Sequence, residues 1–369
     1  MLEAGAYCSG PKSVMNSMVR STMFGGGMLN RRGLLAAGLL SPAGLVLPGR
    51  QALAARPRPH GGNDNSAKGI SWPTALLMAT GRPGGAYGIY GPAWGALAQQ
   101  ACGVSVAYLA SGGAASDILL IEQGAAQLGM TTVTVADQAI SGTGAWTAGV
   151  KLSSFRALFP IFPSVLQVMA LEGSGITSLS ALAGRRIGVG PDGGSGSVAI
   201  PALLRSLGAA PAACLTGDIW PQVRRTLAGE LDACAFIGAP PLPAIQAAAQ
   251  HHRLIIIGFT PEETERAVKA VPGITAMTIP EGIFANQSNP IASIGTENFA
   301  IGAARLPAGL VAALTTTAMR NRNKLAALVP AVAQSAKMAL PQGEMSFHPG
   351  AALALRSFGL DVPAKFVES

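Results

Sequence analysis

The sequence predicts an α/β protein made of mostly parallel sheets with helices on both faces. Short apolar segments alternate with Ala/Leu-rich helical segments along most of the chain. The 369 residues are enough for two ordinary α/β domains. Three Gly/Ser-rich loops, at 81–88, 111–114 and 190–197, follow predicted strands. Ligands of parallel sheets bind outside such strand ends, so these loops are the first candidates for a site.

The elements follow from apolar runs bounded by glycine and proline, and from longer runs rich in Ala and Leu. The expected strands are 73–80, 104–109, 127–133, 156–161, 165–171, 186–190, 232–237 and 254–258. The expected helices are 91–101, 114–123, 178–183, 197–207, 220–228, 241–250 and 307–327.

The net charge of +8 does not indicate a nucleic-acid partner. The first 55 residues hold five cations and one anion, which leaves +4 for the remainder. That remainder has no dense Lys/Arg stripe with interleaved aromatic residues. We therefore expect no nucleic acid.

Residues 28–55 resemble an export signal. The pair Arg31-Arg32 precedes an apolar run over 33–47, and Ala-Leu-Ala at 52–54 offers the small residues that a signal peptidase recognises. Twin arginines followed by Gly-Leu-Leu resemble a Tat signal, and a Sec signal with two arginines is the alternative. We expect residues 1–55 to be an N-terminal extension and signal peptide, cleaved near Ala54, and the mature protein to be periplasmic.

Export implies an oxidising compartment. The mature chain keeps Cys102, Cys214 and Cys234, an odd number that one chain cannot pair completely. A Cys214–Cys234 bridge is one interpretation, since both lie in apparent strands, and three buried thiols are the other. The four histidines are scattered, so we expect no metal site and no cofactor.

The glycine-rich loops suit the binding of a small anion better than catalysis. The loop at 81–88 reads G-R-P-G-G-A-Y-G and has neither the G-x-G-x-x-G spacing nor the lysine of a nucleotide loop. Around Ser195 the order Gly-Gly-Ser-Gly-Ser lacks the final glycine of a nucleophile elbow. A carboxylate held by backbone N–H groups at helix N-termini fits both loops. For any single loop the alternative is a structural turn whose glycines provide positive φ.

A collinear set of motifs lies between residues 74 and 359. The motifs are A-T-G-R-P-G-G-A-Y at 79–87, S-G-G-A-A-S-D-I at 111–118, G-A-A-Q-L-G at 124–129, S-G-I-T-S-L-S-A-L-A-G-R-R at 174–186, G-S-G-S at 194–197, Asp232-Ala233, G-A-P at 238–240 and F-H-P-G-A at 347–351. Together they resemble the TAXI-type solute receptors of TRAP transporters, which are periplasmic binding proteins.

The resemblance implies a two-lobed periplasmic-binding-protein type II fold, each lobe a mostly parallel sheet flanked by helices. Lobe I would comprise 73–164 plus 298–369 and lobe II 165–297, joined by hinge strands near 162–166 and 295–299. It implies a small anionic solute (a carboxylate, dicarboxylate or oxoacid, or an amino acid) held between the lobes and delivered to TRAP permease membrane subunits. We expect a monomer without enzymatic activity.

The resemblance and the loops together give a set of expected ligand-binding residues. They are Gly81, Arg82, Gly84, Gly85, Ala86, Tyr87, Ser111, Gly112, Gly113, Thr132, Thr134, Gly194, Ser195, Gly196, Ser197 and Gly238. Arg82 either contacts the ligand or points to water, and Tyr87 either lines the cleft or packs between loop and helix.

Two departures from the family pattern bear on the ligand. Val133-Thr134 stands where many relatives have Ser-Asp, and Val198 stands where many have Glu. Without these acids, we expect a carboxylate that lacks an α-amino group.

Two alternatives to a transport receptor stay open. One is an exported enzyme on the same fold, although the sequence has no obvious nucleophile, base or metal cluster. The other is a binding protein that signals to a membrane sensor.

Overall fold

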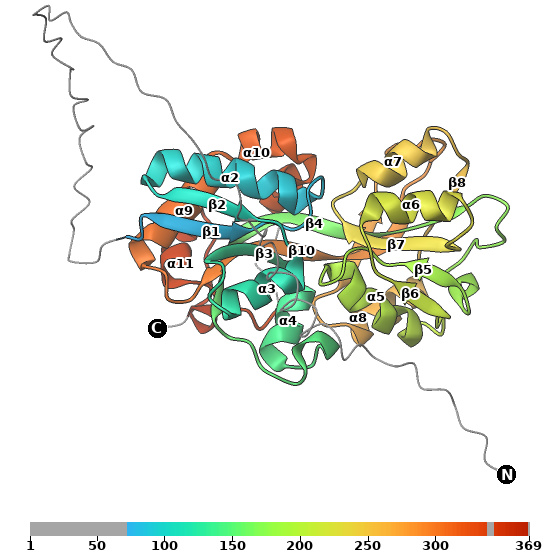
Figure 1. Cartoon of the computed structure of the whole chain (residues 1–369), viewed down its shortest axis with the longest axis horizontal. Helices are drawn as coiled ribbons and strands as arrows, with labels where there is room; N and C mark the ends of the chain where they lie inside the picture. Colours follow the sequence, from blue (N-terminus) through green and yellow to red (C-terminus); the bar gives the residue numbers. More distant parts are fainter. Residues whose placement is uncertain (1–71, 338–342, 368–369) are drawn as a thin grey trace, which may run out of the picture. The chain divides into compact units, whose positions relative to one another are not determined.

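The computed structural model describes residues 72–337 and 343–367 (Figure 1). The expected N-terminal extension and signal peptide, at 1–55, lie outside the described residues.

The first elements form a parallel sheet with helices between its strands. They are β1 (Ala75–Ala79), α2 (Ala86–Cys102), β2 (Ser105–Leu109), α3 (Ala114–Glu122), β3 (Leu128–Thr132), α4 (Val133–Ser141) and the 3-10 turn η1 (Ala145–Thr147). β1 pairs in parallel with β2 and with β3. The expected start of α2 at residue 91 is wrong, because Gly85 already has the extended backbone of an N-cap and Pro92 lies inside the helix.

Two long strands, β4 (Phe155–Leu171) and β10 (Ile291–Ala303), run through both halves of the molecule (Figure 1). We expected two strands, 156–161 and 165–171, with a hinge near 162–166, where the structure has the single strand β4. Pro160 and Pro163 lack an N–H for a sheet ladder, but they lie opposite a register shift between Glu297 and Phe299 of β10, so the strand continues past them. β10 itself was expected only as a hinge segment.

The middle of the chain builds the second half of the molecule. Its elements are the 3-10 turn η2 (Ser180–Leu182), β5 (Arg186–Gly188), α5 (Ser195–Ser206), β6 (Ala213–Leu215), α6 (Ile219–Leu227), β7 (Ala233–Gly238), α7 (Pro243–Ala249), β8 (Leu254–Ile257), α8 (Pro261–Ala270) and β9 (Thr275–Ile279). The helix expected at 178–183 is only the turn η2, and α8 and β9 were not expected.

The C-terminal segment returns to the half that begins with β1. It contains α9 (Ala308–Arg320), α10 (Arg322–Leu328), the 3-10 segment η3 (Pro330–Lys337), α11 (Pro349–Arg356) and the turn η4 (Ala364–Phe366). α9 packs against α2 and α11. The single helix expected at 307–327 is two helices that meet at Asn321, and α4 and α11 were not expected.

The sheet is mixed. Its strand order is β2-β1-β3-β10-β4-β7-β5-β6, with β8 beside β4 and β9 beside β10. β5 pairs in parallel with β6 and β7, and every antiparallel pair involves β4 or β10. The predicted α/β fold class is confirmed. The expectation of mostly parallel sheets is wrong, because four described strand pairs are parallel and five, all with β4 or β10, are antiparallel.

Of the two interpretations of the cysteines, the Cys214–Cys234 bridge is wrong. Cys214 lies in β6 and Cys234 in β7, with β5 between them. Two strand spacings are about 9.6 Å, which exceeds the roughly 7 Å that a disulfide spans between Cα atoms. No disulfide joins the two residues.

Buried hydrophobic residues form separate cores in the two halves. One core contains residues between Leu76 and Phe162 and between Phe299 and Val362. The other two contain residues between Val165 and Ile294. We therefore propose the division at 164/165 and 297/298, and we call the half with the first core lobe I and the other half lobe II.

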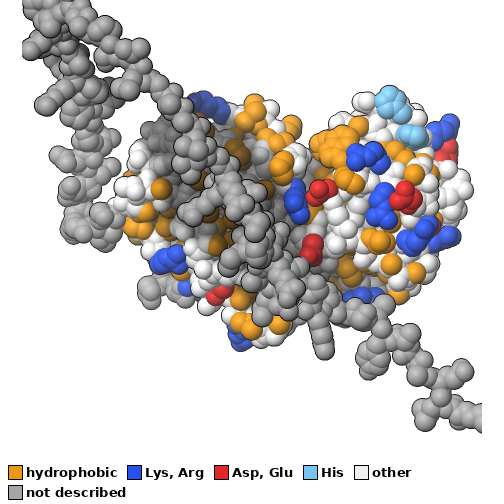
Figure 2. Space-filling model, viewed as in Figure 1, with side chains coloured by type: hydrophobic (Ala, Val, Ile, Leu, Met, Phe, Trp, Pro, Cys, Tyr) orange, Lys and Arg blue, Asp and Glu red, His pale blue; other side chains and the backbone are white. Residues whose placement is uncertain are grey.

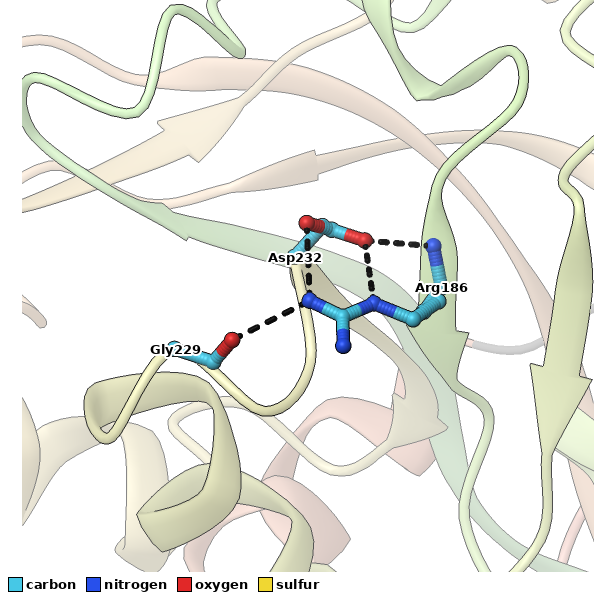
Figure 3. A network of polar contacts seen from close by, with 3 residues as sticks. All are labelled: Arg186, Gly229 and Asp232. Atoms are coloured by element: carbon cyan, nitrogen blue, oxygen red, sulfur yellow. Dashed lines mark hydrogen bonds and ion pairs between the residues drawn. The ribbon is translucent and has the colours of Figure 1, made fainter.

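Two residues of the family-like motifs have a structural role in lobe II (Figure 3). The Arg186 guanidinium donates to both carboxylate oxygens of Asp232, at 3.0 and 3.3 Å, and to the Gly229 carbonyl at 3.1 Å. The backbone N–H of Arg186 also donates to Asp232 at 2.7 Å. These bonds hold β5 to the turn before β7 and lower the pKa of Asp232.

Candidate functional site

A cavity of about 670 Å³ lies between the lobes, at the carboxyl ends of several strands. Lobe I contributes the loops after β1 and β2, and lobe II contributes the loops after β5, β6 and β7. In an α/β sheet these are the ends at which ligands bind. The cavity is therefore the candidate functional site.

The loop after β1 delivers the start of α2 to this cavity. Gly81 and Gly84 adopt positive φ values of 67° and 80°, which glycine tolerates and other residues rarely adopt. Gly85 is the N-cap of α2, and its position has no side chain to cap the helix. The first-turn N–H groups have no intrahelical acceptor, and no acidic residue lies in this turn. This helix end is a suitable partner for an anion.

The loop after β5 makes the same arrangement from the opposite lobe. Gly194 is the N-cap of α5, again without a side-chain cap, and the first turn of α5 contains no acidic residue. Gly194, Ser195 and Gly196 line the cavity. Two uncapped helix N-termini from different lobes therefore share one cavity.

A buried network holds the first two loops together. The Ser111 hydroxyl donates to Asp117 and accepts from the N–H groups of Gly81 at 2.9 Å and Gly113 at 3.2 Å. The other Asp117 oxygen accepts from the N–H of Met130 at 3.0 Å. Burial raises the pKa of Asp117 to about 7, against the opposing effect of the bonds from Ser111 and Met130.

The lobes touch directly beside the cavity. The N–H groups of Ala115 and Ser116 in lobe I donate to the carbonyl of Gly193 in lobe II, at 3.0 and 3.3 Å. The Ser195 hydroxyl lies 3.5 Å from that of Thr132. The structure thus represents a closed arrangement of the two lobes around the cavity.

Few charges face the cavity. Among the described residues that line it, only Arg82 and Asp218 have charged side chains. They belong to different lobes and form an ion pair, with Nε and Oδ1 3.4 Å apart and both side chains more than half exposed. Arg82 is therefore engaged with Asp218 and does not project freely into the cavity.

The expected site residues divide into two groups. Eleven line the cavity, namely Gly81, Arg82, Gly84, Gly85, Ala86, Tyr87, Gly112, Gly113, Gly194, Ser195 and Gly196. The lining does not include Ser111, Thr132, Thr134, Ser197 or Gly238.

The second group has structural contacts instead. Thr132 caps α4 by accepting from the N–H of Val135, and Thr134 bonds to Thr296. Ser197 donates to the Gly194 carbonyl, and the Gly238 carbonyl accepts from Gln167. Ser111 belongs to the network with Asp117.

The sequence did not indicate the apolar wall of the cavity. This wall includes Phe162, Trp220, Phe236, Pro240, Pro241 and Leu242. The run Ala-Pro-Pro-Leu-Pro at 239–243 was a usable signal, because closely spaced prolines after a strand end form a surface with few N–H groups. The segment 328–331 also lines the cavity, and nothing in its local sequence pointed there.

Over residues 72–337 and 343–367, no group of three or more His, Cys, Asp or Glu side chains is arranged to hold a metal ion. In the same residues, no helix has both the length and the apolar composition needed to cross a bilayer.

Two lobes, joined by β4 and β10 and closed around one cavity, define a two-lobed α/β protein of the periplasmic-binding-protein type II fold. The chain belongs to the NMT1-like family, whose model matches residues 78–359.

Three solved structures are similar to this chain. The glutamate-bound ligand-binding core of GluR0 from Nostoc punctiforme is 16% identical, with a TM-score of 0.43, over 69% of this chain and 96% of that one. The MOPS-bound alkanesulfonate-binding protein of Xanthomonas axonopodis pv. citri is 12% identical, with a TM-score of 0.44, over 80% and 86%. A periplasmic transporter is 13% identical, with a TM-score of 0.47, over 78% and 93%. None of these likenesses indicates what this chain binds.

Proposed function

We propose that this protein is an extracytoplasmic receptor that captures a small anionic solute between its lobes and releases it unchanged. One observation carries the proposal: the uncapped N-termini of α2 and α5, from opposite lobes, line a single cavity. A carboxylate between them accepts hydrogen bonds from both lobes. Hydrogen bonds to a charged group contribute about 1.5–3 kcal/mol each, so a few are enough for micromolar binding.

Binding is coupled to lobe closure. A ligand that touches both lobes binds the closed form better than the open one, and this difference shifts the equilibrium toward closure. The contacts of Gly193 with Ala115 and Ser116 complete the closed form at the edge of the cavity. The solute is released when these contacts open.

The proposal extends to the route by which the solute is delivered to the membrane. The collinear motifs between residues 74 and 359 support a receptor of the TAXI type, which works as a periplasmic monomer and hands its solute to TRAP permease subunits. Uptake by co-reconstituted permease in vesicles tests this: solute entry should need an ion gradient and no ATP. ATP-dependent uptake would contradict the TRAP assignment and leave the receptor function intact.

Native mass spectrometry of freshly purified protein, followed by calorimetry, tests the receptor function. We expect a bound anionic solute that is recovered chemically unchanged after incubation. Val133, Thr134 and Val198, where we expected missing acids to matter, do not line the cavity. Among the described lining residues the acid is Asp218, which is paired with Arg82, so no free carboxylate is present to hold an ammonium group and 2-oxoglutarate should bind better than glutamate. Tight glutamate binding with no oxoacid binding would overturn that preference, and chemical conversion of the solute would overturn the receptor function.

A further inference from the structure

We propose that the solute is a monocarboxylate with a large apolar body, so that its anionic group meets the helix ends and its body fills the rest of the cavity. This inference rests on the proposed function and narrows it. It depends on the charge and polarity of the cavity lining away from the helix N-termini.

The described lining of the cavity offers no free charge to a second charged group of a ligand. Among the described residues that line it, Arg82 and Asp218 are the charged ones, and they already pair with each other at 3.4 Å and are more than half exposed. A second carboxylate, or the ammonium group of an amino acid, would lose its water without gaining a partner, which is costly. The charge pattern therefore favours a ligand with one charge.

Three polar residues that line the cavity, Tyr87, Asn298 and Ser164, are already hydrogen-bonded to one another. The Tyr87 hydroxyl donates to Asn298 at 2.5 Å, and the Asn298 amide donates to the Phe162 carbonyl at 2.7 Å and to the Ser164 hydroxyl at 2.8 Å. Both amide hydrogens of Asn298 are thereby used. The donors of Tyr87 and Asn298 are therefore used within the protein, which leaves little polar capacity beside them for a second hydrophilic end.

The apolar wall is poor in hydrogen-bond donors. Phe236 and Leu242 line it together with Pro240 and Pro241, which have no N–H group. A cavity of about 670 Å³ is in the usual range for drug-sized ligands. A small dicarboxylate would leave much of this apolar volume unfilled.

The apolar lining continues to the outside. Ile89, Trp220 and Leu328 line the cavity and are nevertheless 39%, 45% and 56% exposed. Figure 2 shows hydrophobic side chains on both sides of the hollow between the two halves. An apolar body can therefore extend from the helix ends toward the opening along these three side chains.

Calorimetry with two matched series of acids tests the inference. The straight-chain monoacids butanoate, hexanoate and octanoate are compared with the dicarboxylates of the same chain length, and with glutamate and 2-oxoglutarate. Each buried CH₂ should tighten monoacid binding about fourfold. Each dicarboxylate should bind at least about tenfold more weakly than its monoacid, because its second charge enters an apolar region.

Two leucine variants test whether the apolar body of a long monoacid packs against the exposed end of the cavity lining. Leu328 lines the cavity, whereas Leu353 in α11 is 67% exposed and is not a lining residue. Leu328→Ala should weaken octanoate several-fold and leave butanoate unchanged, while Leu353→Ala should change neither. Both side chains are exposed, so neither variant should disturb folding.

Other outcomes separate the failure of the inference from the failure of the proposed function. Tighter binding of a dicarboxylate or glutamate than of any monoacid would overturn the apolar-body inference and leave the anion receptor standing. Equal binding of octan-1-ol and octanoate would overturn the anionic receptor itself. If no acid of either series binds, both proposals fail.

Discussion

The hydroxyl of Tyr87, at the start of α2, donates a 2.5 Å hydrogen bond to Oδ1 of Asn298 on the crossing strand β10. Asn298 in turn donates to Phe162 and Ser164 on the other crossing strand, β4. One side chain therefore connects the first glycine-rich loop to both strands that join the lobes. A movement of the loop and a movement of the crossing strands β4 and β10 are therefore coupled through this hydrogen bond.

Tyr87→Phe is expected to destabilise the protein. It leaves the buried Asn298 oxygen without its donor, and an unsatisfied buried acceptor costs about 1–3 kcal/mol. Urea unfolding of the ligand-free protein measures this loss. The control is Tyr108→Phe, because the Tyr108 hydroxyl bonds to the Pro92 carbonyl at an exposed position and its loss should cost less than about 0.5 kcal/mol. Equal losses in the two variants would contradict a special role for the Tyr87 bond.

The ion pair between Arg82 and Asp218 is expected to affect ligand release more than folding. Both side chains are more than half exposed, so Arg82→Ala should change the free energy of unfolding by less than about 1 kcal/mol. The pair joins the two lobes, however, so its loss favours the open form. Stopped-flow measurements should show faster release of a bound carboxylate, by roughly two- to fivefold.

The charge-swapped double variant Arg82→Asp/Asp218→Arg is the matched control for this experiment. It restores an opposite-charge pair across the lobes and should return the release rate toward that of the original protein. A rate that stays fast in the double variant would show that Arg82 acts on the ligand directly.

The sequence predicted the strand–loop–helix order well because the parallel strands are short apolar runs and the loops after them are marked by glycine. It predicted the crossing strands poorly. It divided β4 into strands at 156–161 and 165–171, whereas β4 continues through Pro160 and Pro163 because a register shift accommodates them. A register shift depends on the partner strand, so the local sequence of β4 does not contain the information.

In the candidate site, too, the features with a local sequence signal were predicted and those that depend on the fold were not. The glycines that line the cavity were predicted because positive φ and close approach leave a local signature in the sequence. The apolar wall was missed, since Phe236 on β7 and the segment 328–331 come together only through the fold. The role of Ser111 could be assigned only with coordinates. The sequence does not show whether the Ser111 hydroxyl faces a ligand or the buried carboxyl group of Asp117.

Two buried carboxyl groups should make stability depend on pH. Burial raises the pKa of Asp117 from 3.8 to about 7 and that of Glu297 from 4.5 to about 7. Both groups therefore bind more protons in the folded than in the unfolded protein between about pH 4 and pH 7. Their contribution is complete below about pH 4 and is lost as the pH rises through 7, so the free energy of unfolding should fall over this window. For Asp117 the change is on the order of 4 kcal/mol, and the half-buried Glu297 contributes less.

Urea unfolding at several pH values checks this expectation. Asp117→Asn removes the titrating group and should flatten most of the pH dependence, and Glu297→Gln should remove a smaller part. Glu297→Gln is a useful second variant because Oε2 of Glu297 has no hydrogen-bond partner in the described part of the chain, so no bond to that oxygen is lost. If stability instead rises between pH 5 and pH 8 in the unmodified protein, the assignment of these carboxyls is wrong.

Gly112 is where closure of the two lobes can be blocked without touching the helix ends. A Cβ atom at this position would overlap the backbone carbonyl oxygen of Asp192, which belongs to the facing loop of lobe II. Gly112→Ala should therefore fold normally in an open form, which has no such contact, and lose at least about tenfold in affinity for its solute.

The matched control is Gly309→Ala in α9, where the nearest side chain, Trp72, leaves ordinary van der Waals space. Calorimetry gives the affinities, and small-angle scattering with and without solute reports closure. The contact with Asp192 exists only between the lobes, whereas the second close contact, 2.6 Å to the Ser116 hydroxyl, lies within lobe I and involves the end of a side chain that can rotate. Unchanged affinity in Gly112→Ala would mean that the solute does not require the closed arrangement, and the coupling of binding to closure would have to be abandoned.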